Sequence, residues 1–321
     1  MRFLLTGGVG YLGGRLTQHL RSQGHHVKVT TRRPASEIPS WFAADAIIRW
    51  DESRPESIDT ALDDVDTLIH LASPDGNAAL ADPVGSLQVS AFLAWNLMEA
   101  AARQHRPPRV VYLSTCHVYG SRKSGLIRED ERPQPVHPYG LGKWFGEEII
   151  QLLRRQRNLK ALSIRLSNGF GAPVGPDISQ WYLVFNDLCR QAVTEGVLRL
   201  KSGGQQTRNF VTLADTVRAI EFIGERPEQW PADGVIHLSS TLNYRILDVA
   251  RLVASRAAAM LGKTPEIVTA APIAETPSPS VQFSIERLTA MGFAWTNDAA
   301  AEVDGTLRVC LEHRDRLMAQ S

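Results

Sequence analysis

Three glycines spaced three residues apart, Gly7, Gly10 and Gly13, separate a short apolar run from a helical pattern at the start of the chain. The run Phe3–Thr6 is typical of a buried strand, and Tyr11–Gln23 carries leucines at helical spacing. Gly7 permits a tight turn, Gly10 lets the backbone approach a pyrophosphate, and Gly13 allows close packing of the helix on the strand. The pattern predicts a dinucleotide site at the positive end of the helix, with a purely structural glycine turn as the alternative.

Strand and helix patterns alternate through the first half of the chain, which predicts an α/β fold with a doubly wound, parallel Rossmann-type sheet. The expected strands are Phe3–Thr6, Val27–Thr31, Ala46–Ile48, Thr67–Leu71, Val110–Ser114, Ala161–Leu166 and Val235–Ser239. The expected helices are Tyr11–Gln23, Leu87–Gln104, Tyr139–Arg157 and Ile246–Leu261. We place a dinucleotide-binding domain at residues 1–170, with a return of the chain to it around 206–240. The smaller lobe at 171–321 is expected to bind mainly substrate, because the pattern becomes irregular from Gly169.

The charge balance excludes several classes of function. The 35 lysines and arginines stand against 34 aspartates and glutamates, which leaves no broad basic field for a nucleic acid or an anionic membrane. The three cysteines, Cys116, Cys189 and Cys310, have no paired spacing, so we expect a reducing compartment and neither a disulfide framework nor a zinc site. The first apolar run is too short for a signal peptide, and no stretch is long enough to span a membrane. A cytoplasmic protein without a metal is the expectation.

The end of the second expected strand carries a further cofactor signal. An acid near this point holds the ribose 2′-hydroxyl in NAD-binding units, whereas this chain has Thr31, Arg32 and Arg33. Guanidinium groups pair with a 2′-phosphate, so we favour NADP over NAD, with solvated loop charges as the alternative. Asp51, just after the third expected strand, either meets the adenine amino group or caps the next turn. The expected cofactor contacts at the glycine-rich turn are Gly7, Gly10, Tyr11, Leu12 and Gly13.

Tyr139 and Lys143 lie at positions i and i+4 of an expected helix and therefore share one face, roughly 6 Å apart at their Cβ atoms. A free tyrosine has a pKa of about 10, and a nearby cation favours the phenolate. Lowering the pKa by ~2–3 units would correspond to roughly 3–4 kcal/mol. Tyr139 then exchanges a proton with a substrate hydroxyl. Thr115 ends an expected strand at the ligand-binding edge of the sheet and would bond the same oxygen.

Together these motifs resemble the extended short-chain dehydrogenase/reductases of the nucleotide-sugar epimerase/dehydratase/reductase superfamily. The similar segments are residues 6–13, 66–72, 114–120, 139–143, 165–171 and 208–211. The resemblance implies that Thr115, Tyr139 and Lys143 form a catalytic triad. It further implies that Asn168 lies near cofactor and substrate, and that Arg208 contacts the pyrophosphate of a nucleotide-sugar. The segment implied to run past the cofactor comprises His70, Leu71, Ala72 and Ser73, with a plain strand position as the alternative for His70.

The chain departs from the superfamily pattern in three ways. Cys116 and His117 stand where dehydratases carry an acidic pair, so 4,6-dehydration is not expected. His117 is kept as a substrate contact or acid/base, with a packed or loop histidine as the alternative. Ser90 replaces a common asparagine, and residues 274–280 lack a second arginine found in many nucleotide-sugar members.

The resemblance implies hydride transfer on a sugar, at C4 of a nucleotide-sugar, by an epimerase or a ketoreductase. One alternative is an NADPH-dependent reductase or dehydrogenase of a non-sugar carbonyl or alcohol, and another is a non-catalytic NADP-binding sensor. The helices expected at Leu87–Gln104 and Tyr139–Arg157 build a dimeric four-helix bundle in many members, so a homodimer is expected.

Overall fold

The computed structural model describes residues 1–31, 38, 39, 42, 47–49, 55–121, 124–178, 180–272 and 280–319. Arg32, Arg33 and Asp51, on which the choice of cofactor was expected to depend, lie outside these residues. Ala46, the first residue of the third expected strand, lies outside them as well.

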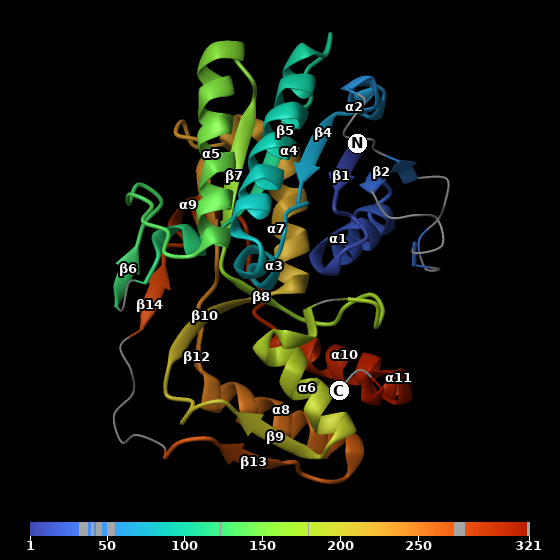
Figure 1. Ribbon diagram of the computed structural model, residues 1–321, viewed down its shortest axis with the longest axis vertical. Helices are drawn as coiled ribbons and strands as arrows, with labels where there is room; N and C mark the ends of the chain where they lie inside the picture. The colour runs from blue at the N-terminus through green and yellow to red at the C-terminus, as the bar shows by residue number, and fades with distance from the viewer. Residues whose placement is uncertain are drawn as a thin grey trace.

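A parallel sheet of seven strands forms the upper part of the molecule (Figure 1). Its order is β11-β7-β5-β4-β1-β2-β3, with neighbouring strands in parallel register. The strands are β1 (Arg2–Thr6), β2 (His26–Thr31), β3 (Ile47–Arg49), β4 (Thr67–His70), β5 (Arg109–Thr115), β7 (Ala161–Leu166) and β11 (Val235–Leu238). This topology confirms the predicted α/β class with a Rossmann-type sheet.

Helices cover both faces of the sheet, because successive side chains of each strand point to opposite sides. Phe3 and Leu5 of β1 pack in one core with α1 (Tyr11–Ser22) and α7 (Leu213–Glu225). Leu4 packs in the other core, between the sheet and a second group of helices. That group is α2 (Pro55–Leu62), α4 (Pro83–Arg103) and α5 (Pro138–Arg157), and the short α3 (Gly76–Ala81) precedes α4. The helix predicted at Leu87–Gln104 starts earlier in the structure, at Pro83, because Asp82 caps α4 and proline is favoured in the first turn of a helix.

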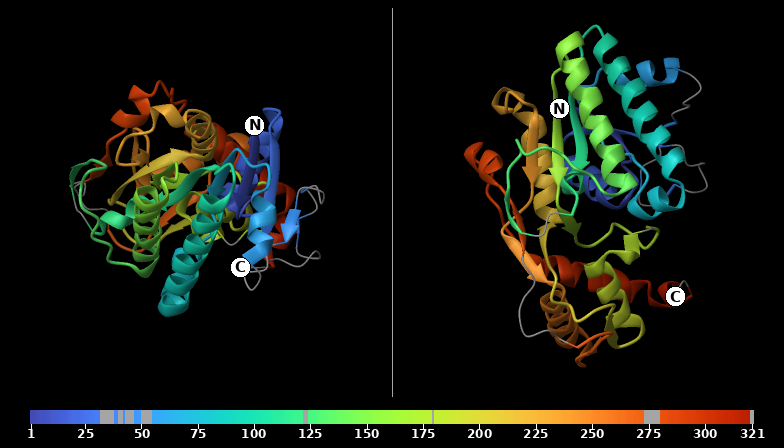
Figure 2. Two further views of the ribbon diagram at one scale, coloured as in Figure 1. Left: turned by 90° about the horizontal axis from the view of Figure 1, so that it is seen from above. Right: turned by 60° about the vertical axis from the view of Figure 1, so that its left-hand side comes forward.

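A second lobe with its own core lies beyond the carboxyl ends of the strands (Figures 1 and 2). Its main helices are α6 (Val184–Thr194), α8 (Ile246–Leu261) and α10 (Ala299–Glu312). Phe170, Phe185 and Phe210 meet at its centre, and the first two stack with ring centroids 3.8 Å apart. Three small sheets edge the lobe or link it to the larger one. The first has three strands, with β10 (Thr207–Thr212) between β8 (Asn168–Phe170) and β12 (Leu242–Arg245). The second pairs β9 (Val197–Leu200) with β13 (Glu266–Thr269). The third pairs β6 (Gly125–Ile127) with β14 (Val281–Phe283).

The C-terminal region is more regular than its composition suggested. Besides β13, β14 and α10 it contains α9 (Glu286–Ala290) and α11 (Arg314–Met318). Cys310 of α10 is buried in the core of the lobe, and all three cysteines are buried and free. Within the described part of the chain, no helix is long and apolar enough to cross a bilayer.

Candidate functional site

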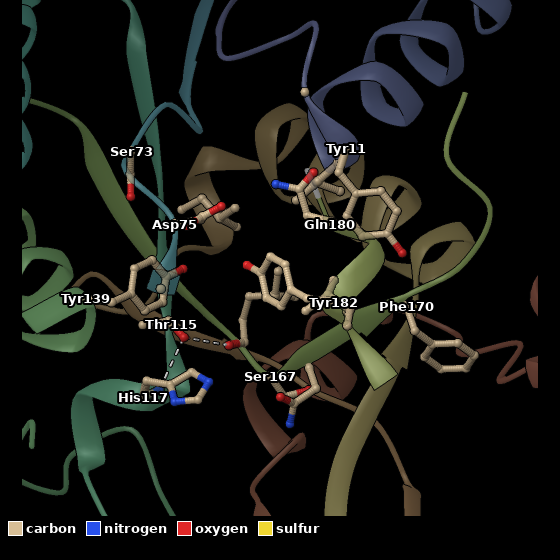
Figure 3. Close-up of a pocket in the computed structure, with 18 of the residues that line it drawn as sticks. Tyr11, Ser73, Asp75, Thr115, His117, Tyr139, Ser167, Phe170, Gln180 and Tyr182 are labelled. Atoms are coloured by element: carbon tan, nitrogen blue, oxygen red, sulfur yellow. Dashed lines mark hydrogen bonds between the residues drawn. The ribbon is translucent and has the colours of Figure 1, made fainter. Parts of the chain in front are cut away.

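A cavity of about 1070 Å³ lies between the carboxyl edge of the large sheet and the second lobe. It is lined by the glycine-rich loop, the ends of β4 and β5, the first turns of α5, and residues of the second lobe (Figure 3). Apart from His70, which is buried in the sheet, every described residue to which the sequence assigned a site role contributes to this one cavity. These residues are Gly7, Gly10, Tyr11, Leu12, Gly13, Thr31, Leu71, Ala72, Ser73, Thr115, His117, Tyr139, Lys143, Asn168 and Arg208.

The glycine-rich loop presents an uncapped helix end to the cavity. Gly10 is the N-cap of α1 without a side-chain cap, and the first turn holds no acidic residue. Gly7 has a φ of +75°, and a Cβ atom on Gly13 would lie 2.0 Å from the Gly7 carbonyl oxygen. The close turn therefore needs glycine at both positions, and its free N–H groups face the cavity as an anion cradle. These features fit the phosphates of a dinucleotide.

The side chain of Tyr11 is committed to contacts within the protein. Its hydroxyl donates to the Gly171 carbonyl oxygen at 2.7 Å and lies 3.2 Å from Asn186 Oδ1. The Tyr11 side chain therefore links the glycine-rich loop to the second lobe. The backbone of Tyr11, not its side chain, is left to bind a phosphate.

Thr115, Tyr139 and Lys143 converge at the junction of β5 and α5. Thr115 is the last residue of β5, and the other two lie in the first two turns of α5. Lys143 Nζ donates to the Leu113 carbonyl oxygen at 2.8 Å and lies 6.0 Å from the centroid of the Tyr139 ring. Figure 3 shows Thr115, His117 and Tyr139 facing the space into which Tyr182 points from the other lobe.

Burial controls the protonation of this group. Burial first, then the charges of Tyr182 and Asp75, raise the pKa of Tyr139 to about 12, against a hydrogen bond with Thr115 that lowers it. Burial also lowers the pKa of Lys143 to about 7, against the charge of Glu147, which raises it. The sequence suggested that the lysine lowers the pKa of the tyrosine. In the folded protein the net shift of the Tyr139 pKa is upward instead, because the desolvation of the buried phenol is its largest cause, and the effect of the lysine itself stays a prediction.

His117 and Cys116 occupy the positions of the missing acidic pair. The His117 backbone N–H donates to Thr115 Oγ1 at 3.2 Å, and its ring meets that of Tyr139 edge-on with centroids 6.1 Å apart. Burial, then the charges of Arg208 and His137, lower the pKa of His117. Cys116 Sγ donates to the Arg165 carbonyl oxygen at 3.3 Å, and burial raises the pKa of its thiol. Neither side chain is an acid of the dehydratase kind.

Asn168 and Arg208 come from the lower wall of the cavity. Asn168 Nδ2 donates to the Asn209 carbonyl oxygen at 2.8 Å, which joins β8 to β10. Arg208 precedes Asn209 on β10, and its charge reaches His117. No residue in the described part of the chain forms an ion pair with the Arg208 guanidinium.

Several lining residues escaped the sequence analysis. Asp75, Gln180 and Tyr182 gather around the space in front of Tyr139 (Figure 3). Asp75 accepts from the Ala78 N–H at 2.9 Å as the N-cap of α3, a pattern visible in the sequence. Nothing in the sequence places that carboxylate beside Tyr139, however, because the two meet only through the sheet topology.

A buried ion pair lies behind Thr115, Tyr139 and Lys143. Glu147, one turn after Lys143, accepts from Arg165 Nη2 at 2.8 Å and from its Nε at 3.1 and 3.2 Å. Ser114 Oγ, next to Thr115, also donates to this carboxylate. The glutamate therefore joins α5 to the ends of β5 and β7.

The family model described as the NAD dependent epimerase/dehydratase family matches residues 3–239. The dTDP-4-dehydro-6-deoxy-D-allose reductase of a Streptomyces species is 26% identical over 302 residues, which cover 89% of this chain and 88% of that protein. UDP-glucuronic acid 4-epimerase from Bacillus cereus, in complex with UDP-glucuronic acid and NAD, superposes with a TM-score of 0.78 at 21% identity, covering 97% of this chain and 99% of that one. RMD from Pseudomonas aeruginosa, complexed with NADPH, gives the same TM-score, identity and coverage. At such identities the structural likeness establishes a shared fold.

Proposed function

The chain belongs to the NAD dependent epimerase/dehydratase family, which confirms the resemblance drawn from its motifs, and on this premise we propose that it transfers hydride at C4 of a nucleotide-sugar. It is an NAD(P)-dependent enzyme of the extended short-chain dehydrogenase/reductase type. The proposed substrate rests on one observation: a single cavity unites a phosphate cradle, a tyrosine–lysine–threonine group and an arginine without an ion-pair partner among the described residues.

Tyr139 is proposed as the acid/base. A bound nicotinamide supplies or accepts the hydride. Tyr139 donates a proton to the substrate oxygen when a carbonyl is reduced, and accepts it when a hydroxyl is oxidised. With a pKa near 12, Tyr139 is a proton donor as the protein stands, so oxidation requires additional positive charge close to its oxygen. Thr115 orients the same substrate oxygen through its hydroxyl.

Lys143 is proposed to supply part of that charge. Its ammonium lies against the Tyr112 and Tyr139 rings, with Nζ 5.3 and 6.0 Å from their centroids. Nζ keeps two further donor hydrogens beyond the one given to Leu113, and these fit hydroxyl groups of a cofactor ribose at the same wall of the cavity. Anchoring the ribose there would fix the nicotinamide relative to Tyr139.

A nucleotide-sugar is proposed as substrate because of Arg208 and the residues opposite the glycine-rich loop. A guanidinium without a carboxylate partner matches a pyrophosphate bidentately. Arg199 and Lys201 line the cavity on the same lobe and add to its positive charge. The lobe from residue 171 onward is accordingly proposed as mainly substrate-binding, and residues 1–170 as the dinucleotide-binding domain.

The cofactor is proposed to be NADP, with NAD as the alternative, on the basis of Arg32 and Arg33 in the sequence. The structural relatives are found with either cofactor: NAD in the Bacillus cereus protein and NADPH in the Pseudomonas aeruginosa protein.

Identifying the nicotinamide nucleotide that the purified protein releases on denaturation separates an epimerase from a ketoreductase. Bound nucleotide in near one-to-one ratio indicates an epimerase that retains its cofactor. A site that takes up NADPH better than NADH on titration indicates a dissociating reductase.

Arg208→Ala tests the substrate class. We expect at least a tenfold rise in the Kd for the nucleotide-sugar, because charge-assisted bonds to its pyrophosphate are lost. Arg199→Ala is the control for the general loss of positive charge. Isothermal titration measures both, and an unchanged Kd in Arg208→Ala would contradict the pyrophosphate contact.

A further inference from the structure

A second group of ligand-forming side chains lies at the opposite edge of the sheet from the cavity, where the end of α1 packs against α7. His25 Nε2 lies 2.9 Å from Glu221 Oε1 and 3.5 Å from Glu225 Oε1. These three ligand atoms all lie within 4.8 Å of one another. His19 Nε2 lies 2.7 Å from the second oxygen of Glu221.

The local structure holds these side chains in place. Glu221 and Glu225 are one turn apart on α7 and share one of its faces. Gly24, with a φ of +79°, reverses the chain after α1 and brings His25 back toward that face. The His25 ring then packs edge-on against Phe3, with ring centroids 5.0 Å apart. Its side chain is 11% exposed and that of Glu221 is 17% exposed, so the group is partly shielded from water.

The two carboxylates of the group would be stabilised by a bound cation. Two carboxylates one turn apart repel each other. Glu225 is relieved by Arg226, whose Nη1 lies 3.3 Å from its other oxygen. Among the described residues, the Glu221 carboxylate pairs only with the imidazoles of His19 and His25.

We propose that His25 Nε2, Glu221 Oε1 and Glu225 Oε1 bind a divalent transition-metal ion, best matched by Zn²⁺. Ligand atoms about 2.0–2.1 Å from a tetrahedral zinc ion lie roughly 3.3 Å apart, close to the distances from His25 to the two carboxylates. Water completes the fourth position. His19 orients the Glu221 carboxylate by binding the oxygen that does not face the ion, in the manner of an outer-shell partner. The ion would join α1 to α7 and serve the fold rather than the reaction.

Coordination changes the tautomer of His25. Its Nδ1 lies 3.2 Å from the Met1 amine. A metal on Nε2 places the ring proton on Nδ1. The sequence argued against a zinc site from its cysteines alone. It could not indicate this one, because His25 and Glu221 are 196 positions apart.

The test is metal binding by the tag-free full chain stripped with a chelator. Zn²⁺ should bind in one-to-one ratio by isothermal titration and raise the melting temperature by about 4 °C at a hundredfold excess over Kd. Co²⁺ should give the visible absorption of a tetrahedral site. His25→Asn and Glu221→Gln should each weaken Zn²⁺ binding at least thirtyfold. His26→Gln, at the exposed neighbouring histidine, is the matched control and should bind as the unsubstituted chain does.

Absence of Zn²⁺ binding by the unsubstituted chain would overturn the proposal. So would retention of full affinity in His25→Asn, or an equal loss in His26→Gln. If Glu221→Gln fails to fold, His25→Asn decides the question, and its melting temperature without metal serves as the folding control.

Discussion

Tyr139 and Lys143 are both buried, and burial moves their pKa values in opposite directions, since the phenol is harder to ionise and the ammonium harder to keep charged. Lys143 is 3% exposed. Its pKa of about 7 in the folded protein lies below the ordinary lysine value of 10.5. The lysine therefore destabilises the fold fully below pH 7, and the penalty fades as the pH rises toward 10.5.

Replacing Lys143 by Met should stabilise the protein at pH 7 while removing its activity. We expect a gain of about 2–3 kcal/mol in the free energy of unfolding, namely the relief of the desolvation penalty less the hydrogen bond to Leu113. The gain should disappear near pH 10. Urea unfolding of both proteins across this pH range measures it, with the exposed Lys263→Met as control. A gain that does not depend on pH would contradict a lysine pKa that burial lowers.

The close approach of Thr115, Tyr139 and Lys143 could be predicted from the sequence, because the tyrosine and lysine share one helix and the threonine ends a strand; their chemical role stays a prediction. The position of Asp75 could not be predicted, because it reaches the same space from another element. The roles of Arg32, Arg33 and Asp51 stay predictions, since these residues lie outside the described part of the chain.

At the scale of elements, Glu147 is the link that holds α5 against β5 and β7. Glu147 is 2% exposed and Arg165 4%, and Ser114 completes the contact. A buried pair of this kind contributes little net stability compared with apolar residues, but the loss of one partner leaves an uncompensated charge.

Glu147→Gln should therefore lower the free energy of unfolding by about 3–5 kcal/mol. Glu148→Gln, one residue further on and exposed, should change it by less than about 0.5 kcal/mol. Chemical denaturation of the two variants side by side measures the difference. Equal stabilities would show that the buried pair does not hold these elements together.

Elements with long regular patterns were predicted with nearly correct bounds. The strand at Ala161–Leu166 and the helix at Ile246–Leu261 agree with β7 and α8 at both ends. The short strands β13 and β14 were missed, because their three or four residues carry no local signal and pair with β9 and β6 far earlier in the chain. Tertiary pairing, not propensity, decides such strands.

At the scale of the whole molecule, α4 and α5 lie side by side (Figure 1). Both helices expose large apolar side chains. Phe92 is 65% exposed, Phe145 48% and Trp95 39%. Exposed aromatic residues gathered on neighbouring helices mark an interaction surface. The expected homodimer would bury them.

Phe92→Asp should accordingly convert the dimer into monomers of 35.4 kDa, because the substitution places a charge in an apolar interface. Leu311→Asp, an exposed apolar position on α10, should leave the assembly unchanged. Light scattering after size exclusion gives the masses. A monomeric unsubstituted chain, or a dimer that survives Phe92→Asp, would contradict an interface on this face.

Hydride transfer that depends on Tyr139 is the central claim of the proposed function. The most direct measurement mixes the cofactor-loaded enzyme with UDP- and dTDP-hexoses and follows the absorbance of the nicotinamide. It is made for the unsubstituted chain and for Tyr139→Phe. We predict that reduced nicotinamide forms with at least one of these sugars. We further predict that Tyr139→Phe slows this step by about 10²–10⁴-fold while keeping its cofactor. Absence of reduction with every sugar despite bound cofactor, or an unchanged rate in Tyr139→Phe, would contradict the proposed function.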